Sequence, residues 1–233
     1  MLEDFIKEPF LGFDKKSVDF LNKLRNKKYN NKKWFDANRD VYENHLKYPM
    51  RTLVDNLAAE LKKIDDSFFI TNKSILRINR DIRFKPDKTP YKTNYAAAFT
   101  YERQKTPEIP QYYFELSYRE FLFAAGQYSM EPNALKKIRR RIFEKFDEFT
   151  DIISEKKFRN KFGDVLGESL QKLPKEFSVK EISPELGKYL KMKQFYVYTT
   201  YEPEVAFGPE LVDLIMEDTG ITHDFTKFLF KSI

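Results

Sequence analysis

The sequence predicts an α+β fold in which N-terminal helices precede a central, mostly antiparallel sheet with a meander, and C-terminal helices enclose one late strand. Apolar residues recur at helical spacing in the first 64 residues and again beyond residue 132. Between these regions apolar and polar residues alternate, most clearly over residues 111–118, as in strands that are buried on one face. With 233 residues, of which 41% are hydrophobic and 16% aromatic, the chain can bury a sizeable core.

The N-terminal region is expected to form an irregular arm at residues 1–13, followed by three helices. These helices cover about residues 15–28, 32–47 and 50–64. Asn30 or Asn31 is expected to cap the second helix, because an amide oxygen can accept the first free backbone N–H groups. Pro49 is expected to interrupt that helix, since proline lacks the N–H that a helix interior requires.

Five strands and a set of C-terminal helices complete the predicted fold. The strands cover about residues 74–80, 93–101, 111–118, 121–128 and 194–201, with a loop through Pro107 and Pro110 between the second and the third. The helices cover about residues 132–154, a shorter segment that ends at Gly163, and residues 184–192, 208–217 and 221–233. Pro132 is favoured at a first helical position, and Ser183 is expected to cap the helix that follows it.

We expect one α+β domain over residues 1–233, because no internal repeat, low-complexity tract or flexible linker divides the chain. Within it, residues 15–64 supply the N-terminal helices, residues 74–128 the sheet core and residues 132–233 the helical remainder. An arrangement of this domain as two lobes is left open.

Composition narrows the possible functions. The 42 lysine and arginine residues outnumber the 36 acidic ones and leave a net charge of +6, which permits an anionic partner without requiring nucleic acid. The chain has no cysteine, which excludes thiolate chemistry and is compatible with a cytoplasmic location. Its apolar runs are far shorter than the roughly 20 residues that span a bilayer, so no membrane partner is expected.

Several common site patterns are missing from the sequence. The seven glycines form no phosphate-binding loop of the Rossmann or P-loop kind, and no Gly-x-Ser-x-Gly elbow occurs. His45 and His223 are too few for a His-rich zinc centre, so no metal site is predicted. Catalysis, if present, would rest on carboxylate, lysine, tyrosine or arginine chemistry, and the cofactor remains unknown.

One stretch joins a high concentration of positive charge to two prolines. Its basic residues are Lys73, Arg77, Arg80, Arg83, Lys85, Lys88 and Lys92. Only Asp81 and Asp87 oppose them, and Pro86 and Pro90 restrict the backbone. The predicted strand ends near Arg80, so the later charges lie on a loop held by a sheet, where binding sites are often found.

This stretch, together with other residues along the chain, resembles a known family. The shared pattern consists of Asn30-Asn31, Trp34-Phe35, Arg39 and Tyr42, then Arg77-Ile78-x-Arg80-Asp81-x-Arg83-Phe84, Asp87-Lys88 and Pro90-Tyr91-Lys92, then Tyr112-Tyr113, Gly126, Leu135 and Ile138-Arg139. From about residue 17 to about residue 200 the chain is similar to a bacterial and fungal family catalogued as domain of unknown function 2461. The resemblance implies a single-domain α+β fold and no particular mechanism.

Arginine and lysine side chains on a stiff loop favour a pocket for a phosphorylated or carboxylated small molecule. Asp81 is the candidate acid–base group. The candidate binding residues are Arg39, Arg77, Arg80, Arg83, Asp87, Lys88, Tyr91 and Lys92. Whether a reaction takes place at this pocket is left open.

A structural salt-bridge cluster is the first alternative, because ion-pair networks also gather charges. The pairs considered are Asp81 with Arg83 or Arg39, and Asp87 with Lys88 or Lys92. The acidic stretch 202–224, which holds no lysine or arginine, can also neutralise the loop.

Two further alternatives concern macromolecular partners. The loop and the basic segment 136–141 can bind nucleic acid, although the many acids of the chain count against it. A protein-interaction module without catalysis is the other alternative, and a large exposed aromatic patch would favour it.

Overall fold

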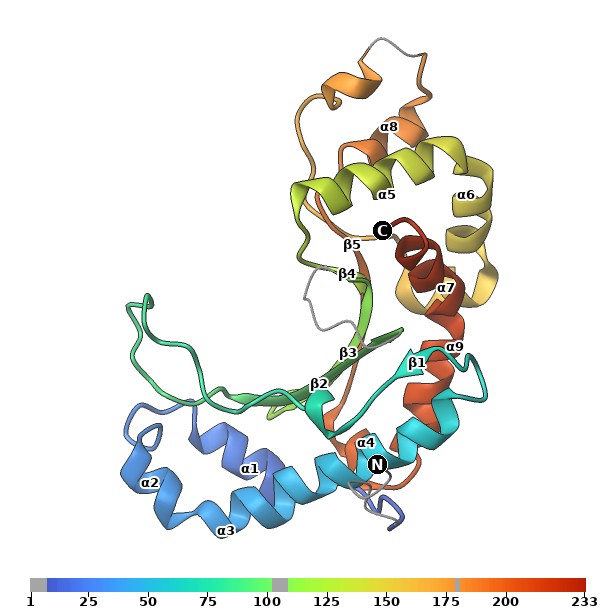
Figure 1. Cartoon of the computed structure of the whole chain (residues 1–233). Coiled ribbons are helices and arrows are strands. Elements are labelled where there is room, and N and C mark those ends of the chain that lie inside the picture. Colours follow the sequence, from blue (N-terminus) through green and yellow to red (C-terminus); the bar gives the residue numbers. More distant parts are fainter. Residues whose placement is uncertain (1–7, 102–108, 179–180) are drawn as a thin grey trace. The chain divides into compact units, whose positions relative to one another are not determined.

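A computed structural model of the chain describes residues 8–101, 109–178 and 181–233 (Figure 1). The first seven residues of the expected arm, and Pro107 of the expected loop, lie outside these ranges. Helices come first, strands follow, and helices with one late strand complete the chain, which confirms the predicted α+β class.

The contacts within the chain define two compact units. Unit 1 comprises Met1–Glu102, Tyr113–Phe123 and Thr200–Asp218, and unit 2 comprises Arg103–Tyr112, Ala124–Thr199 and Thr219–Ile233. The division falls within three strands and within the last helix. The expectation of a single domain over the whole chain stays a prediction.

Five strands form one antiparallel sheet in the order β1-β2-β3-β4-β5. Their bounds are β1 Phe68–Phe69, β2 Asn94–Tyr101, β3 Gln111–Ser117, β4 Phe121–Gln127 and β5 Phe195–Tyr201. Strands β2 to β5 lie within one residue of the ranges expected from alternation, so that pattern predicted them well. Strand β1, with only two residues, carries too little sequence pattern to be predicted.

The predicted strand at residues 74–80 was wrong. This segment instead makes two isolated bridges with the chain near β2, Ile75 with Ala97 and Asn79 with Tyr91. Three residues separate Ile75 from Asn79, whereas five separate their partners Ala97 and Tyr91, so two extra residues bulge from the second segment between the bridges. The bulge breaks the regular hydrogen-bond ladder, and the segment remains extended without being a strand.

The N-terminal helices differ from expectation at their boundaries. Their bounds are α1 Lys15–Lys23, α2 Lys32–Ala37, α3 Arg39–Tyr42, a π-helical turn Glu43–Lys47, and α4 Tyr48–Leu61. Asn31 caps α2, because its side-chain oxygen accepts the backbone N–H of Trp34 at 3.0 Å. The predicted second helix is divided at Asn38, whose side chain donates to the carbonyl of Trp34 at 2.8 Å.

The expected break at Pro49 was also wrong, since the backbone stays helical through this residue. Proline cannot donate to the carbonyl four residues earlier, which belongs to His45. That oxygen instead accepts a hydrogen bond of 2.6 Å from the Ser17 hydroxyl on α1. The π-helical turn and this outside donor let the helix continue past the proline.

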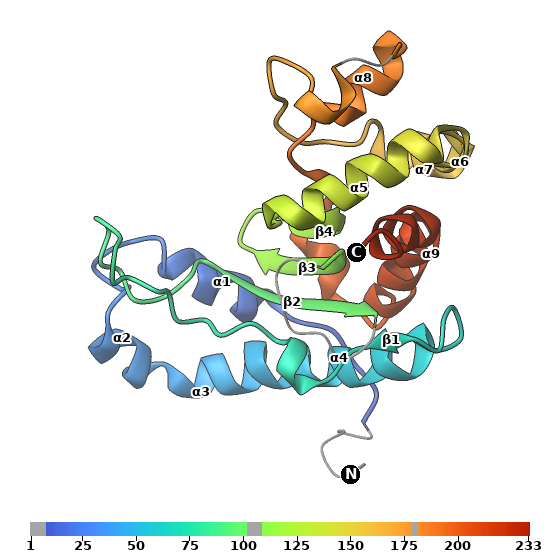
Figure 2. The same ribbon diagram turned by 45° about the horizontal axis from the view of Figure 1, so that its top comes forward.

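Unit 1 has a core of aliphatic residues from α4 and aromatic residues from the sheet. Leu53 and Leu57 are fully buried, as are the strand residues Phe114 and Phe121, and Phe99 is almost so. Figures 1 and 2 show α1, α3 and α4 running along one side of β2. This packing holds the start of β2, and the basic loop before it, on a rigid base.

Unit 2 contains most of the later helices. The α-helices that follow β4 in the sequence are α5 Pro132–Glu144, α6 Phe146–Ser154, α7 Lys156–Phe162, α8 Pro184–Leu190 and α9 Leu211–Phe230. Short 3-10 helices occur along the chain at Asn72–Ser74, Lys175–Phe177 and Pro203–Phe207. One predicted helix, 132–154, is therefore divided at Lys145, a position without a glycine or proline signal. Conversely, α9 joins the two final predicted helices, because Gly220 continues the helix without strain.

Gly126 is required where β4 meets β5. Its φ is +116°, and a Cβ atom at this position would lie 2.3 Å from the backbone oxygen of Phe195. A larger residue would therefore separate the two strands.

Candidate anion-binding site

The basic loop, defined as residues 77–92, leaves the sheet region as an irregular hairpin (Figures 1 and 2). Backbone hydrogen bonds close its base, from Arg80 N–H to the Pro90 carbonyl and from Lys92 N–H to the Ile78 carbonyl, both at 2.8 Å. Ile78 is buried and anchors the hairpin to the core, whereas Arg77 and Asn79 are exposed. The alternation expected for residues 77–80 is thus retained without a regular strand.

Asn30 connects the base of the loop to the turn between α1 and α2. Its buried amide donates to the carbonyls of Leu24 and Tyr91 at 2.7 and 2.9 Å, and its oxygen accepts the N–H of Tyr91 at 3.0 Å. One side chain therefore satisfies both backbone groups of Tyr91. Because such buried groups are costly to leave unpaired, this contact fixes the loop relative to the helices.

The ring of Tyr91 adds a stacking contact at the same place. It lies parallel to Phe35 of α2, with 4.1 Å between the ring centroids. The Arg39 guanidinium lies 5.5 Å from the centre of the Phe35 ring and pairs with Asp36 at 2.5 Å. The helix residues Phe35 and Arg39 of the family pattern thus support the loop.

Arg80, Asp87 and Thr89 form a clasp across the loop. Arg80 Nη1 donates to Asp87 Oδ2 at 2.6 Å, to the Thr89 carbonyl at 3.0 Å and to the Thr89 hydroxyl. Asp87 also accepts the N–H of Thr89 at 3.1 Å. The Arg80 hydrogen bond and the Thr89 N–H stabilise the carboxylate and lower the pKa of Asp87 to about 2.

Asp81 and Arg83 form a second, more exposed pair. Both oxygens of Asp81 accept from the Arg83 guanidinium, at 3.0 and 2.7 Å. This hydrogen bonding lowers the pKa of Asp81, so the group is a carboxylate and a weak base at neutral pH. Lys88 donates to the carbonyl of Ile82 at 3.0 Å.

A hollow of about 360 Å³ lies beside the clasp, between the loop and the end of α1. Four cationic side chains line it: Arg25, Lys27, Arg80 and Lys92. Asp87 is the one acid in its lining. Since Arg80 already engages that carboxylate, the hollow keeps an excess of positive charge.

Lys92 is a half-buried cation of this hollow. Within the described chain it has no ion pair, and its side chain is half-buried. Burial and the positive charge of Arg77 lower the pKa of Lys92, and the charge of Glu115 opposes this effect only in part. An anion bound in the hollow would stabilise the protonated form of Lys92.

Glu115 belongs to a polar group on the sheet that adjoins Lys92. Its carboxylate accepts hydrogen bonds from the Asn94 amide and the Tyr113 hydroxyl. Burial and the charge of Glu115 raise the pKa of Tyr113 well above its usual range, so this hydroxyl remains a donor. The bonds orient Glu115 on the strands, leaving Lys92 without a direct carboxylate contact.

The structure brings together four of the sequence-predicted site residues, namely Arg80, Asp87, Tyr91 and Lys92, which all line the hollow. The lining does not include Arg39, Arg77, Asp81, Arg83 and Lys88. Sequence reasoning missed Arg25, Lys27, Asn94 and Glu115 as neighbours of the site. The sequence placed Arg25 and Lys27 within the first predicted helix, whereas α1 ends at Lys23 and both residues line the hollow beside the loop.

The ion pairs of the loop are local. Asp81 pairs with Arg83, one of the two partners considered, whereas Asp87 pairs with Arg80 and not with Lys88 or Lys92. In the acidic stretch 202–224, Asp218 is buried and accepts from the Tyr201 hydroxyl at 2.7 Å. Arg80 and Arg83 thus take their partners from the loop itself.

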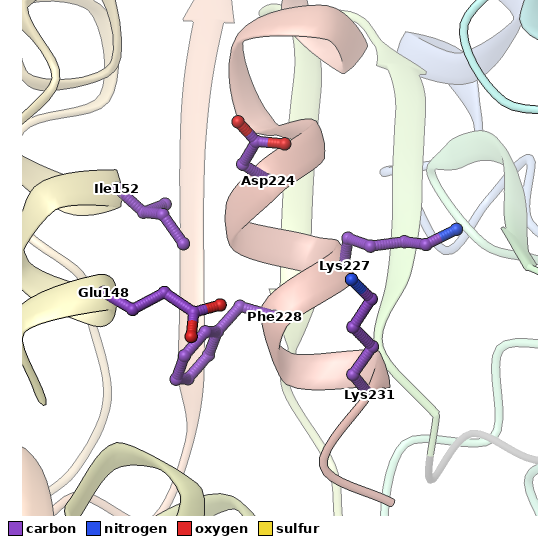
Figure 3. A pocket seen from close by; sticks show the side chains of 6 residues that line it. All are labelled: Glu148, Ile152, Asp224, Lys227, Phe228 and Lys231. Atoms are coloured by element: carbon purple, nitrogen blue, oxygen red, sulfur yellow. The ribbon is translucent and has the colours of Figure 1, made fainter. Parts of the chain in front are cut away.

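Other hollows have charge arrangements that suit an anion less well. In the pocket of about 230 Å³ lined by residues of α6, residues of α9 and Lys231, two acids balance two lysines, and Figure 3 shows Lys227 extending away from Glu148. A second hollow, in unit 1, is lined by the acids Glu8, Asp55, Glu60 and Asp213. A third, on α5, is lined by Glu176 and by three cations that are all exposed, Lys136, Lys137 and Arg140.

The described part of the chain shows neither a metal-binding cluster nor a membrane-spanning helix. No cluster of three or more His, Asp or Glu side chains there has the geometry to hold a metal ion. No helix in those ranges has the length and apolar character that crossing a bilayer requires.

Fold and site together define an α+β protein with a cation-lined hollow beside a clasped basic loop. The chain belongs to the family described as conserved hypothetical protein (DUF2461), whose model matches residues 16–228. This match confirms the resemblance found in the sequence. A search of the curated proteins gives no match to the chain.

Proposed function

We propose that this protein binds a phosphorylated or carboxylated small molecule in the hollow beside the basic loop. Lys92 is the observation that carries the proposal, because it is a half-buried ammonium group without a carboxylate partner within the described residues. Arg25, Lys27 and Arg80 line the same hollow and add positive charge. Arginine can bind phosphate or carboxylate through two donors at once.

The supporting structure of the loop favours binding over a purely internal salt-bridge cluster. Asn30 and the Arg80–Asp87–Thr89 clasp hold the backbone in place without using Lys92. A preorganised site loses less conformational entropy when it binds a ligand. We assign no reaction step to Asp81, since both of its oxygens bond to Arg83. A cytoplasmic location also stays a prediction.

The test is a thermal-unfolding experiment with inorganic pyrophosphate and citrate as probes. At about ten times its dissociation constant, a probe adds about 1.4 kcal/mol to the free energy of unfolding and raises Tm by about 3–5 °C. Lys92→Met keeps the length of the side chain and removes its charge. We expect this variant to lose most of the shift, because the half-buried cation is removed from the hollow.

Lys85→Met is the matched control, since Lys85 lies on the same loop and does not line the hollow. It should retain the shift. Without probe, Lys92→Met should melt at or above the wild-type temperature, because burial of the charged amine opposes folding. A lower melting temperature without probe, or equal probe shifts in the two variants, contradicts the proposal and supports a structural role for Lys92.

A further inference from the structure

Phe84 stands apart from the other phenylalanines of the protein. Its side chain is 91% exposed, whereas every other described phenylalanine is buried or half-buried. It lies near the tip of the basic loop, about four residues from Arg80 at the edge of the hollow. An exposed aromatic ring offers a flat apolar face on which a planar group of a ligand can stack.

The tip that carries Phe84 is held in one shape by local hydrogen bonds. Arg83 N–H donates to Asp81 at 3.2 Å, and the Lys85 N–H donates to the carbonyl of Ile82 at 3.4 Å. Lys88 reaches back to the same carbonyl at 3.0 Å. The ring is therefore presented on an ordered turn, and binding to it requires little further ordering.

Cations accompany the ring on the loop and recur across the hollow. The Arg83 guanidinium lies 5.9 Å from the Phe84 ring. At the end of α1, Arg25 lines the hollow and also lies 4.0 Å from the ring of Tyr118, which Arg119 approaches at 5.5 Å. Aromatic rings with nearby cations thus occur on the basic loop and beside Arg25, and both segments contribute residues to the lining of the hollow.

We propose that the anion bound at this site is a single-stranded nucleic acid, with one backbone phosphate in the hollow and a base stacked on Phe84. This inference rests on the anion site of the proposed function and replaces its small-molecule ligand by a chain of nucleotides. Stacking on an aromatic ring and charge contacts with phosphates are the two features of single-strand binding. A small anion in the hollow would leave Phe84 exposed, whereas a chain of nucleotides would cover it.

The same features distinguish a single strand from two other partners. In a duplex the faces of the bases are stacked on one another, so an exposed ring cannot stack on them without unpairing the helix. Membrane insertion of a single phenylalanine is too weak for stable binding, because firm anchoring needs a larger apolar area or a second signal. We therefore assign the surface to a single strand.

The experiment measures fluorescence anisotropy with labelled 12-nucleotide single strands of DNA and RNA of mixed sequence at 50 mM salt. The wild type should bind at least one of them. Phe84→Ala should weaken binding about tenfold or more, because a stacked base contributes about 1–3 kcal/mol. Phe84→Leu should also be weakened, since leucine retains apolar area and lacks an aromatic face. Lys92→Met should weaken the same strand by removing a phosphate contact.

Salt and competing partners complete the test. With about four phosphate contacts, raising the salt from 50 to 200 mM should weaken binding about fifty-fold. A duplex of the same sequence should bind more weakly than the single strand. Leu11→Ala is the control for Phe84→Ala, because it removes another exposed apolar side chain outside the loop and should leave binding unchanged.

The outcomes separate this inference from the proposed function. Pyrophosphate stabilisation that depends on Lys92, together with no binding of either strand, overturns the inference and leaves the proposed function standing. Strand binding that Phe84→Ala leaves unchanged also overturns the inference. It is overturned as well if neither strand binds and the protein instead binds vesicles with 30% phosphatidylserine through Phe84. Pyrophosphate stabilisation that is absent from the wild type, or that Lys92→Met leaves unchanged, would count against the proposed function itself.

Discussion

At the scale of single residues, the site depends on side chains that hold backbone groups in place. Asn30 is the main example, because its amide satisfies the N–H and the carbonyl of Tyr91 and the carbonyl of Leu24. It is only 4% exposed, so water cannot replace these bonds. The stack of the Tyr91 ring on Phe35 likewise holds the Tyr91 side chain in place.

We predict that Asn30→Ala lowers the free energy of unfolding by about 3 kcal/mol, because it leaves buried backbone groups of Leu24 and Tyr91 unpaired. Chemical denaturation monitored by circular dichroism measures the change. Asn22→Ala, on the exposed side of α1, is the control and should change stability by less than about 0.5 kcal/mol. An equally small effect of Asn30→Ala would show that the Asn30 bonds do not fix the loop.

The sequence predicted a charged loop with candidate site residues, but it did not predict which of these residues form ion pairs with one another. Asp87 has five basic residues within seven positions of it, and sequence spacing favoured Lys88 or Lys92 as its partner. The observed partner is Arg80, because the closed base of the hairpin brings the first and last parts of the loop together. Such a choice depends on the path of the backbone, which charge patterns do not describe.

At the scale of elements, the basic loop is a clasped hairpin. Asp87 and Thr89 lie between Pro86 and Pro90 and bond to each other, and Asp87 also bonds across the loop to Arg80. Two hydrogen-bonded pairs and two prolines restrict the same short segment. This explains how an exposed, highly charged stretch can keep an ordered shape.

The clasp predicts a pH dependence that belongs to this element. The pKa of Asp87 is lowered to about 2, compared with about 4 for an aspartate in an unfolded chain. Its pairing therefore stabilises the folded loop fully above about pH 4, and that contribution disappears as the pH falls through about 2. Carboxyl NMR of the wild type should show Asp87 titrating near pH 2, with the Thr89 N–H signal following it.

Asp87→Asn provides the comparison for that titration, because the amide retains the shape and loses the charge. In this variant the acid-dependent change of Thr89 should be absent. A carboxyl group at Asp87 that titrates near pH 4 in the wild type would show that Arg80 does not hold it in solution.

Elements with a strong repeating pattern could be predicted from the sequence, and elements shaped by tertiary contacts could not. Strands β2 to β5 alternate clearly, and α8 has both a serine cap and a first-turn proline. By contrast, the helix through Pro49 depends on a hydroxyl from α1, and the bulge beside residues 75–79 has no local signal. In both cases a residue distant in sequence decided the outcome.

At the scale of the whole molecule, a modest net charge conceals an uneven distribution. The chain has a net charge of +6, yet unit 1 contains both the cation-lined hollow and a hollow lined by four acids. Composition could therefore indicate an anionic partner without locating its site. The location follows from the hairpin, the turn after α1 and the sheet residue Glu115, which sequence alone does not bring together.

The ammonium group of Lys92 gives the most direct test of the anion site, because its pKa reports the charge around it. Carbon-13 NMR of the lysine side chains can follow this pKa with and without inorganic pyrophosphate. We predict a value below the usual range of lysine in the free protein and a rise when pyrophosphate binds, since a bound anion stabilises the protonated amine. A Lys92 pKa that pyrophosphate leaves unchanged would contradict an anion-binding site in this hollow.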